Sequence, residues 1–383
     1  MLLSAKRNFF PVTTVLSTIV FILATVALQL YWNEDHYFAM MRAKALCLIP
    51  IAIVCLITLI VWGIEYCRNR RYIERRCNFS LLDAAVALFA VSAIVTWLIS
   101  PIPQKAFSGE LGMRCGSFLY ITGAVIYFIV SRNMRPAKWV IALLMGVWAV
   151  IFLWTILNQM GVDLFGMHQN MQPSEVRMYT ASFGNTNAGS DCFCLLLPIG
   201  IIMYLYSDNT KLTGWLRLYI ALGICGILFL RTEGALFGIM FIMPFLVYIS
   251  FSSNEKLDRL LEIILIASLS FVLFHWYTVI YHITDLSLAM QISFYYVGEI
   301  LLVLTLAVIT MRRRGMLVYD AERNHAIWKW MTYSFTIAIA AIIVFFIVYS
   351  TYHPTFGTNR GAIWRGSVWA YRMYSPRELL FGE

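Results

Sequence analysis

The stretch ALCLIPIAIVCLITLIVWGI, residues Ala45 to Ile64, decides the fold class of this chain. It carries no charged side chain over about 20 residues, the length that an α-helix needs to cross the hydrocarbon core of a bilayer. Its apolar residues run continuously, whereas a membrane-spanning β-strand would alternate apolar and polar positions. Lys44 precedes the stretch and Arg68 follows it. The pattern therefore predicts a transmembrane helix.

The composition extends this prediction to the whole chain. Of its 383 residues, 61% are hydrophobic and 13% are charged, whereas a soluble domain has roughly 25% charged residues. The net charge of +9 would suit nucleic acid, but the basic residues lie in short segments between apolar runs. In such segments they act as topology signals and attract anionic lipid. We expect an all-α fold, a polytopic transmembrane helix bundle that contacts membrane lipid and has no nucleic-acid partner.

About eleven apolar runs are candidate spans. They are Pro11 to Leu30, Ala45 to Ile64, Leu81 to Ile99, Ser117 to Val130, Trp139 to Leu157, Ala188 to Tyr206, Trp215 to Leu230, Gly234 to Phe251, Leu260 to Ile280, Met290 to Thr310 and Ile327 to Tyr349. Only Arg231 to Glu233 separates the seventh run from the eighth, so one bent unit is an alternative there. We predict a transmembrane helical domain over residues 1–350. Residues 351–383 would begin a large extracytoplasmic loop that the sequence leaves incomplete.

The distribution of positive charge predicts the orientation. With a cytoplasmic N-terminus and eleven spans, 19 of the 29 lysines and arginines fall in inner segments, and every inner segment has at least two. Merging the seventh and eighth runs would break this alternation for all later segments. The excess of inner positive charge favours eleven spans with the N-terminus inside, in the cell membrane.

Ten basic residues remain for the outer side, and eight of them are arginines. Guanidinium binds phosphate through paired hydrogen bonds and stays charged at any relevant pH. Arg231 lies between two apolar runs, where an ionisable group is costly; it is a candidate binding residue, or else it pairs with Glu233. Arg177 precedes Asn185 and Asn187, which could cap the sixth span or help its N–H groups bind an anion.

The last outer segment also combines arginine with tryptophan. Arg360 and Trp364 are four residues apart and share one face of a helix, while Arg365 and Trp369 line the neighbouring face. This pattern predicts an interfacial helix that binds either a substrate or lipid headgroups.

Four motifs follow one another along the chain. The first is Ser100-Pro101 with Gly109, Arg114 and Gly116; the second is Gly184-Asn185-Thr186-Asn187, running into Leu195 to Pro198; the third is Thr232-Glu233-Gly234-Ala235; the fourth is Arg360 with Trp364, before Leu379-Leu380-Phe381-Gly382. In order and spacing they resemble the O-antigen ligase and O-antigen polymerase superfamily of membrane glycosyltransferases. One departure concerns the third motif, where Glu233 stands at the usual arginine position and Arg231 lies two positions earlier.

The resemblance implies an activity for the outer face. A glycan would pass from undecaprenyl pyrophosphate to a glycan or glycolipid acceptor during cell-surface polysaccharide synthesis, by ligation or polymerisation. The family's catalytic histidine is expected beyond Glu383, so the catalytic residue is unassigned. The expected site residues are Arg114, Arg177, Arg231 and Arg360 for the pyrophosphate, supported by Asn185, Asn187, Trp364 and Arg365. Arginines can stabilise a diphosphate leaving group without a metal ion or cofactor.

A transporter or flippase of a lipid-linked glycan is the alternative. Such a protein would place charged residues along the whole path, inside the spans. The spans here are nearly free of charge, with Arg217, Arg231 and Glu299 near their ends. This distribution favours a one-sided site and hence the transferase.

Overall fold

The computed structural model describes residues 12–68, 79–109, 114–283, 287–319, 321–352, 362–363, 365–369 and 372–375. Every regular element in these ranges is a helix, which confirms the all-α prediction for them. The chain divides into two compact units. The first comprises Met1–Leu144 and Ser367–Glu383, and the second comprises Met145–Gly366.

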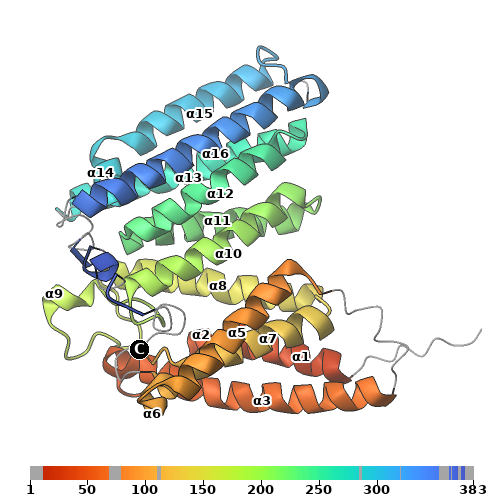
Figure 1. Cartoon of the computed structure of the whole chain (residues 1–383). Helices are drawn as coiled ribbons and strands as arrows, with labels where there is room; N and C mark the ends of the chain where they lie inside the picture. The colour runs from red at the N-terminus through yellow and green to blue at the C-terminus, as the bar shows by residue number, and fades with distance from the viewer. Residues whose placement is uncertain are drawn as a thin grey trace, which may run out of the picture. The chain divides into compact units, whose positions relative to one another are not determined.

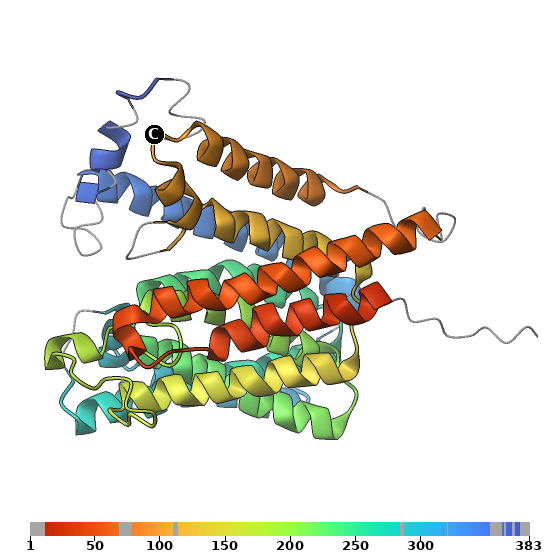
Figure 2. The same ribbon diagram turned by 90° about the horizontal axis from the view of Figure 1, so that it is seen from below.

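The first unit is built on three mutually packed helices, α1, α3 and α7, with α5 packed against α7. Figure 2 shows α1 and α3 side by side. Val20, Ile51, Cys55 and Ile129 form the buried core of these helices. The elements of this unit are α1 (Val12–Ile22), the π-helix η1 (Leu23–Ala27), α2 (Leu28–Leu30), the 3₁₀ turn η2 (His36–Ala39), α3 (Met40–Arg68), α5 (Leu81–Ile99), α6 (Pro103–Ser108) and α7 (Ser117–Asn133).

The helix α8 (Lys138–Gln159) passes from the first unit into the second. The second unit continues with α9 (Pro173–Val176), α10 (Thr186–Tyr206), α11 (Thr210–Leu230), α12 (Glu233–Ser250), α13 (Asn254–Ile280), α14 (Leu288–Phe294), α15 (Val297–Arg313) and α16 (Ala321–Tyr352). The links between its long helices alternate between two ends in Figure 1. We call the end that carries α9 and the α11–α12 link the α9 end. The other end carries the α10–α11, α12–α13 and α15–α16 links.

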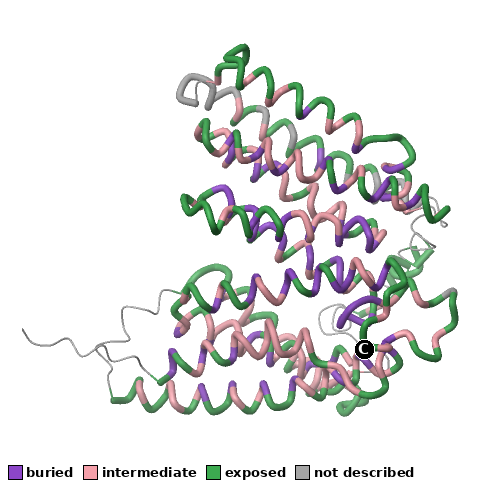
Figure 3. Tube along the Cα trace, turned by 180° about the vertical axis from the view of Figure 1, so that it is seen from behind, coloured by how far each residue is buried: buried purple, intermediate pink, exposed green. Residues whose placement is uncertain are grey.

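Burial within the second unit is uneven. Buried residues concentrate along α10 and α11, whereas α15 is largely exposed (Figure 3). The exposed residues of α15 include large aliphatic side chains such as Val303 and Leu304. A helix that exposes aliphatic side chains is suited to contact with lipid rather than water.

Local sequence sets where several helices begin. In each case a polar side chain accepts the backbone N–H of a residue in the first turn, which satisfies a donor that has no partner within the helix. These capping residues are Ser80, Asn185, Asn209, Ser253 and Ser287.

In the part of the chain that the structure describes, eight helical segments are long and apolar enough to cross a membrane. They are Val12–Leu30, His36–Arg68, Leu81–Ile99, Lys138–Gln159, Thr186–Tyr206, Thr210–Leu230, Glu233–Ser250 and Asn254–Ile280. Each overlaps a predicted span, so the prediction of a membrane protein with transmembrane helices is confirmed in this coarser form. The three other predicted spans coincide with α7, with α14 and α15 together, and with α16.

One predicted span has to be corrected. The run from Met290 to Thr310 is two helices, because the chain breaks at Tyr295 and Tyr296, and Tyr296 adopts a left-handed conformation (φ 54°). The second helix begins beside Gly298, where a Cβ would lie 2.6 Å from the Cβ of Phe271 in α13. The break lets the backbone of α15 approach α13 closely at this glycine.

The seventh and eighth predicted spans are separate helices, α11 and α12, and both pack on α10. Small residues permit the close approach of α12 to α10. A Cβ on Gly238 would lie 2.5 Å from the sulfur of Cys194, and the Cys194 thiol donates to the carbonyl of Ala235. Small residues spaced four apart, here Gly234 and Gly238, are typical of tightly packed transmembrane helices.

Candidate functional site

The candidate site lies at the α9 end of the second unit and is organised by Gln159, the last residue of α8. The side chain of Gln159 is buried. Its Nε2 donates to the backbone carbonyl of Arg177 (3.2 Å), and its Oε1 accepts from Nη2 of Arg231 (3.4 Å). One amide group therefore joins the side chain of Arg231 to the backbone of Arg177, two of the arginines that the sequence predicted for the site.

Tyr277 of α13 supports the same position. Its hydroxyl donates to the backbone carbonyl of Gln159 (3.3 Å), and its ring packs on Phe229 of α11 with centroids 4.8 Å apart. The end of α8 is thus fixed to α11 and α13. Because the last carbonyls of a helix lack partners within it, the tyrosine hydroxyl also satisfies one of them.

Arg231 has an unusual backbone. It follows the last residue of α11 in the left-handed region (φ 52°, ψ 30°), and its N–H donates to the carbonyl of Leu228. Glycine is favoured at this position, and a side chain there costs roughly 1–2 kcal/mol. The turn reverses the chain within two residues, so Arg231 is held next to the start of α12 at Glu233.

The loop between α8 and α10 is held by its own polar side chains. Asp163 accepts the N–H groups of Met167 (2.9 Å) and His168 (2.8 Å), and Nε2 of His168 lies 3.2 Å from the carbonyl of Tyr179. Asn158 accepts the N–H of Ala181 at 2.8 Å. These contacts give the segment that carries Arg177 a defined course, although the Arg177 side chain itself is exposed.

The start of α10 lies against the α11–α12 link. Asn185 caps α10 by accepting the N–H of Asn187 at 2.7 Å, so the predicted capping role falls to Asn185 alone. A Cβ on Gly189 would lie 3.5 Å from the Leu230 side chain, and one on Gly234 would lie 3.7 Å from Oγ of Ser190. The second and third sequence motifs therefore meet in space, and two helix N-termini come together at this point.

Several hydroxyl groups in these segments are buried without a hydrogen-bond partner among the described residues. They belong to Thr180, Ser182 and Thr232, and Thr232 precedes α12 without capping it through its side chain. A buried hydroxyl without a partner is costly, and such groups call for a functional explanation. Hydroxyl donors, helix N-termini and arginines all favour an anionic ligand.

Arg114 belongs to the first unit. It has a left-handed backbone (φ 54°), and its buried Nε has no hydrogen-bond partner in the described ranges. Gly116 follows closely, and a Cβ there would clash with the backbone carbonyl oxygen of Phe107. A Cβ on Gly109 would lie 2.6 Å from the backbone carbon of Arg114, so the backbone of the first motif is closely packed at this arginine.

The remaining predicted site residues come from the last segment. Arg360 and Trp364 lie outside the described residues. Arg365 is exposed and lies within the helical residues 365–369.

No family model matches the chain, and neither the curated proteins nor the solved structures contain a match to it. The geometry of the site is therefore the basis for assigning a function. Among the described residues no group of three or more histidine, cysteine, aspartate or glutamate side chains could hold a metal ion.

Sequence reasoning missed Gln159 and Tyr277. Gln159 does carry one signal, because it is the polar residue that ends an apolar run. Nothing local distinguishes Tyr277 from the other tyrosines near span ends. Their roles arise from contacts between distant positions: Gln159 and Arg231 are 72 positions apart in the chain, and Gln159 and Tyr277 are 118 positions apart.

A second polar cluster lies elsewhere in this unit, where α13, α14 and α15 meet. Nδ1 of His275 lies 3.0 Å from the carbonyl of Ser293, and its Nε2 lies 3.9 Å from Oε1 of Glu299. Both carboxylate oxygens of Glu299 are buried without a hydrogen-bond partner in the described part of the chain. The sequence places His275 within a predicted span and Glu299 near a span end, and the structure brings them together.

Proposed function

We propose that this protein is a metal-independent membrane glycosyltransferase of the O-antigen ligase and polymerase type. It transfers a glycan from undecaprenyl pyrophosphate to a glycan or glycolipid acceptor. The observation that carries the proposal is the Gln159 amide, which joins Arg231 to the backbone of Arg177 beside the N-termini of α10 and α12. This combination suits a diphosphate.

The proposed topology has eleven spans in the cell membrane, with the N-terminus in the cytoplasm. It adds α7, the α14–α15 pair and α16 to the eight apolar segments. The α9 end then lies on the extracytoplasmic side, while Arg217, Arg259 and Arg312 lie at the other end of their helices, on the cytoplasmic side. This arrangement obeys the positive-inside rule.

The chemistry follows from the leaving group. Breaking the bond between the sugar and the diphosphate places growing negative charge on the departing phosphate oxygens. Arg231, positioned by Gln159 before the reaction, and Arg177, carried on a loop whose backbone is fixed, stabilise that charge more strongly in the transition state than in the ground state. The lipid tail lies along the spans. Arg114 and Arg360 stay sequence-based candidates for the same role.

Binding by the purified chain gives the direct test. In nanodiscs, Arg231→Ala and Arg177→Ala should each weaken the binding of undecaprenyl pyrophosphate at least tenfold, because each removes a charged contact to phosphate. Arg42→Ala is the matched control, since Arg42 is an exposed arginine of α3 on the same predicted side. Equal affinities for all three variants and the parent would contradict the assignment of the arginines.

Orientation is tested separately with reporter fusions. A reporter in the Gly161–Met171 loop should lie outside the cytoplasm, and one at Ser207–Asn209 should lie inside. If both reporters report the same side, the proposed topology is wrong even if the ligand binds.

The His275–Glu299 pair favours one alternative, a flippase of a lipid-linked glycan, because transporters keep titratable pairs inside their spans. Glu299→Gln separates the two functions. A flippase should lose transport of the lipid-linked glycan across the bilayer, whereas the transferase should keep its affinity for undecaprenyl pyrophosphate and show no transport to lose.

A further inference from the structure

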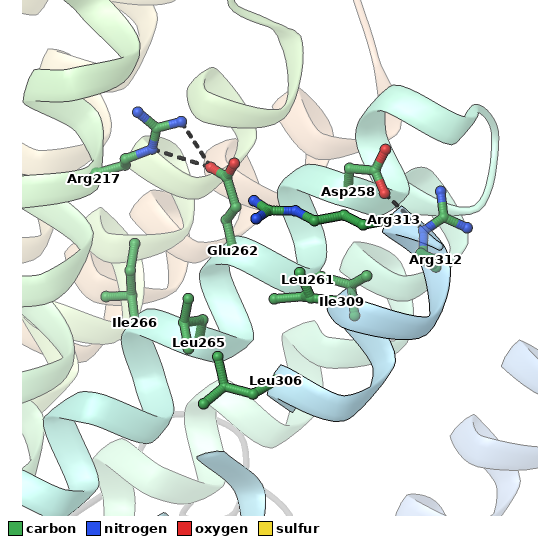
Figure 4. A pocket seen from close by; sticks show the side chains of 10 residues that line it. All are labelled: Arg217, Asp258, Leu261, Glu262, Leu265, Ile266, Leu306, Ile309, Arg312 and Arg313. Atoms are coloured by element: carbon green, nitrogen blue, oxygen red, sulfur yellow. Dashed lines mark hydrogen bonds and ion pairs between the residues drawn. The ribbon is translucent and has the colours of Figure 1, made fainter. Parts of the chain in front are cut away.

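At the end opposite the candidate site, the second unit contains a cavity of about 680 Å³. It runs along α13, which packs against both α11 and α15. Figure 4 shows three arginines around it: Arg217 comes from α11, and Arg312 and Arg313 come from the end of α15. The proposed site for undecaprenyl pyrophosphate uses none of these residues.

The cavity has a polar mouth and an apolar floor, and helix periodicity produces both. On α13, Asp258 and Glu262 are followed one or two turns deeper by Leu265 and Ile266, on the same face of the helix. On α15, Leu306 lies seven residues before Arg313, or about 10 Å along the axis. Charged groups therefore surround the entrance and aliphatic side chains line the depth.

The charges at the mouth are not fully balanced. Arg217 donates to Glu262 from Nη2 at 2.8 Å, and Arg312 donates to Asp258 from Nε at 2.8 Å. Arg313 has no ion-pair partner among the residues whose structure is described, and Figure 4 shows its side chain reaching toward Glu262. Three arginines against two carboxylates leave an excess of one positive charge.

We propose that this cavity binds one anionic phospholipid of the cytoplasmic leaflet, with its phosphate at Arg313 and the upper part of an acyl chain over Leu265 and Leu306. The order of charge and apolar surface matches the order of phosphate and chain in such a lipid. Basic pockets between transmembrane helices on the cytoplasmic side are suited to anionic headgroups. The proposal uses only the membrane orientation given above and does not require glycan transfer.

A bound lipid would contribute stability that the existing ion pairs do not supply. Both pairs are partly exposed, and such pairs contribute little by themselves. A phosphate at Arg313 would add a charge-assisted contact and join α15 to α13. We therefore expect the bound lipid to stabilise the packing of these two helices.

The test compares lipids on the purified full chain. Native mass spectrometry and thermal unfolding are measured with added phosphatidylglycerol or phosphatidylcholine of the same chain length. We expect phosphatidylglycerol to bind more tightly and to raise the unfolding temperature. Arg313→Gln should weaken its binding about fivefold, the change expected for losing one cation near a phosphate. Arg314→Gln is the matched control, because it removes the same charge one residue outside the cavity lining.

Two further experiments test whether the ligand is a whole lipid rather than a free phosphate. Ile309→Trp should fill the floor and weaken phosphatidylglycerol binding with all arginines in place. Inorganic phosphate at matched ionic strength should not displace the lipid. Equal binding of both lipids, equal effects of Arg313→Gln and Arg314→Gln, no effect of Ile309→Trp, or displacement by inorganic phosphate would each overturn the proposal.

Discussion

Replacing Gln159 with alanine tests whether one buried amide positions the Arg231 side chain and the backbone at Arg177 in the candidate site. The substitution removes the bond to the Arg177 carbonyl (3.2 Å) and the bond from Arg231 (3.4 Å), but it keeps the backbone carbonyl that accepts from Tyr277. An ordinary hydrogen bond contributes about 1 kcal/mol net. The bond to the charged Arg231 is long, so it also contributes about 1 kcal/mol, toward the low end for charged partners.

Together the two bonds amount to about 2 kcal/mol, so the affinity for a diphosphate lipid should fall by up to about 30-fold. The assay is equilibrium binding of undecaprenyl pyrophosphate to the purified chain in nanodiscs. Gln172→Ala is the matched control, because Gln172 is an exposed glutamine of the same loop whose side chain does not cap α9.

A double-mutant cycle then separates positioning from direct binding. If Gln159 acts partly through Arg231, then Gln159→Ala combined with Arg231→Ala should cost less than the sum of the single changes. Strict additivity, or normal affinity in Gln159→Ala alongside a loss in Arg231→Ala, would refute the reasoning that the amide holds the arginine in place.

The remaining predictions concern stability, measured by thermal unfolding in detergent. Gly200→Ala should destabilise the second unit by about 1–3 kcal/mol, because its Cβ would lie 2.5 Å from the buried ring of Tyr219; Gly214→Ala, with nothing within 4 Å, should not. Asp83→Asn should destabilise the first unit clearly, since it removes the buried carboxylate that lies 2.6 Å from Nη2 of Arg132. Its control, Asp258→Asn, breaks an exposed pair and should cost under about 1 kcal/mol. Equal losses within either pair of variants would contradict the role given to burial.

The sequence predicted where the helices are with good accuracy. The run Leu81 to Ile99 is identical in the structure, and the predicted span from Ala188 to Tyr206 begins two residues late. These features depend on local composition, since about 20 apolar residues in succession satisfy their own backbone only as a helix in lipid. The break at Tyr295 was missed because it lies beside a tertiary contact, Gly298 against Phe271, that joins residues 27 positions apart in the chain.

The candidate site was predicted only in part, because only some of its features depend on local sequence. Arg177 and Arg231 were selected from their positions at the ends of apolar runs. Their connection through Gln159 was not, because hydrogen bonds between distant residues leave no periodic trace in the sequence. The eleven-span orientation and the assignment to the glycosyltransferase superfamily stay predictions.

The sequence by itself determined that this is a helical membrane protein, because the free energy of placing a segment in lipid depends mainly on that segment's own side chains. Only the tertiary structure decided that Gln159, Arg177, Arg231 and Tyr277 share one end of a helical unit while Arg217, Arg312 and Arg313 surround a cavity at the other. Those groupings depend on which helices pack together and at which residues, and that choice is made by side-chain contacts between distant segments.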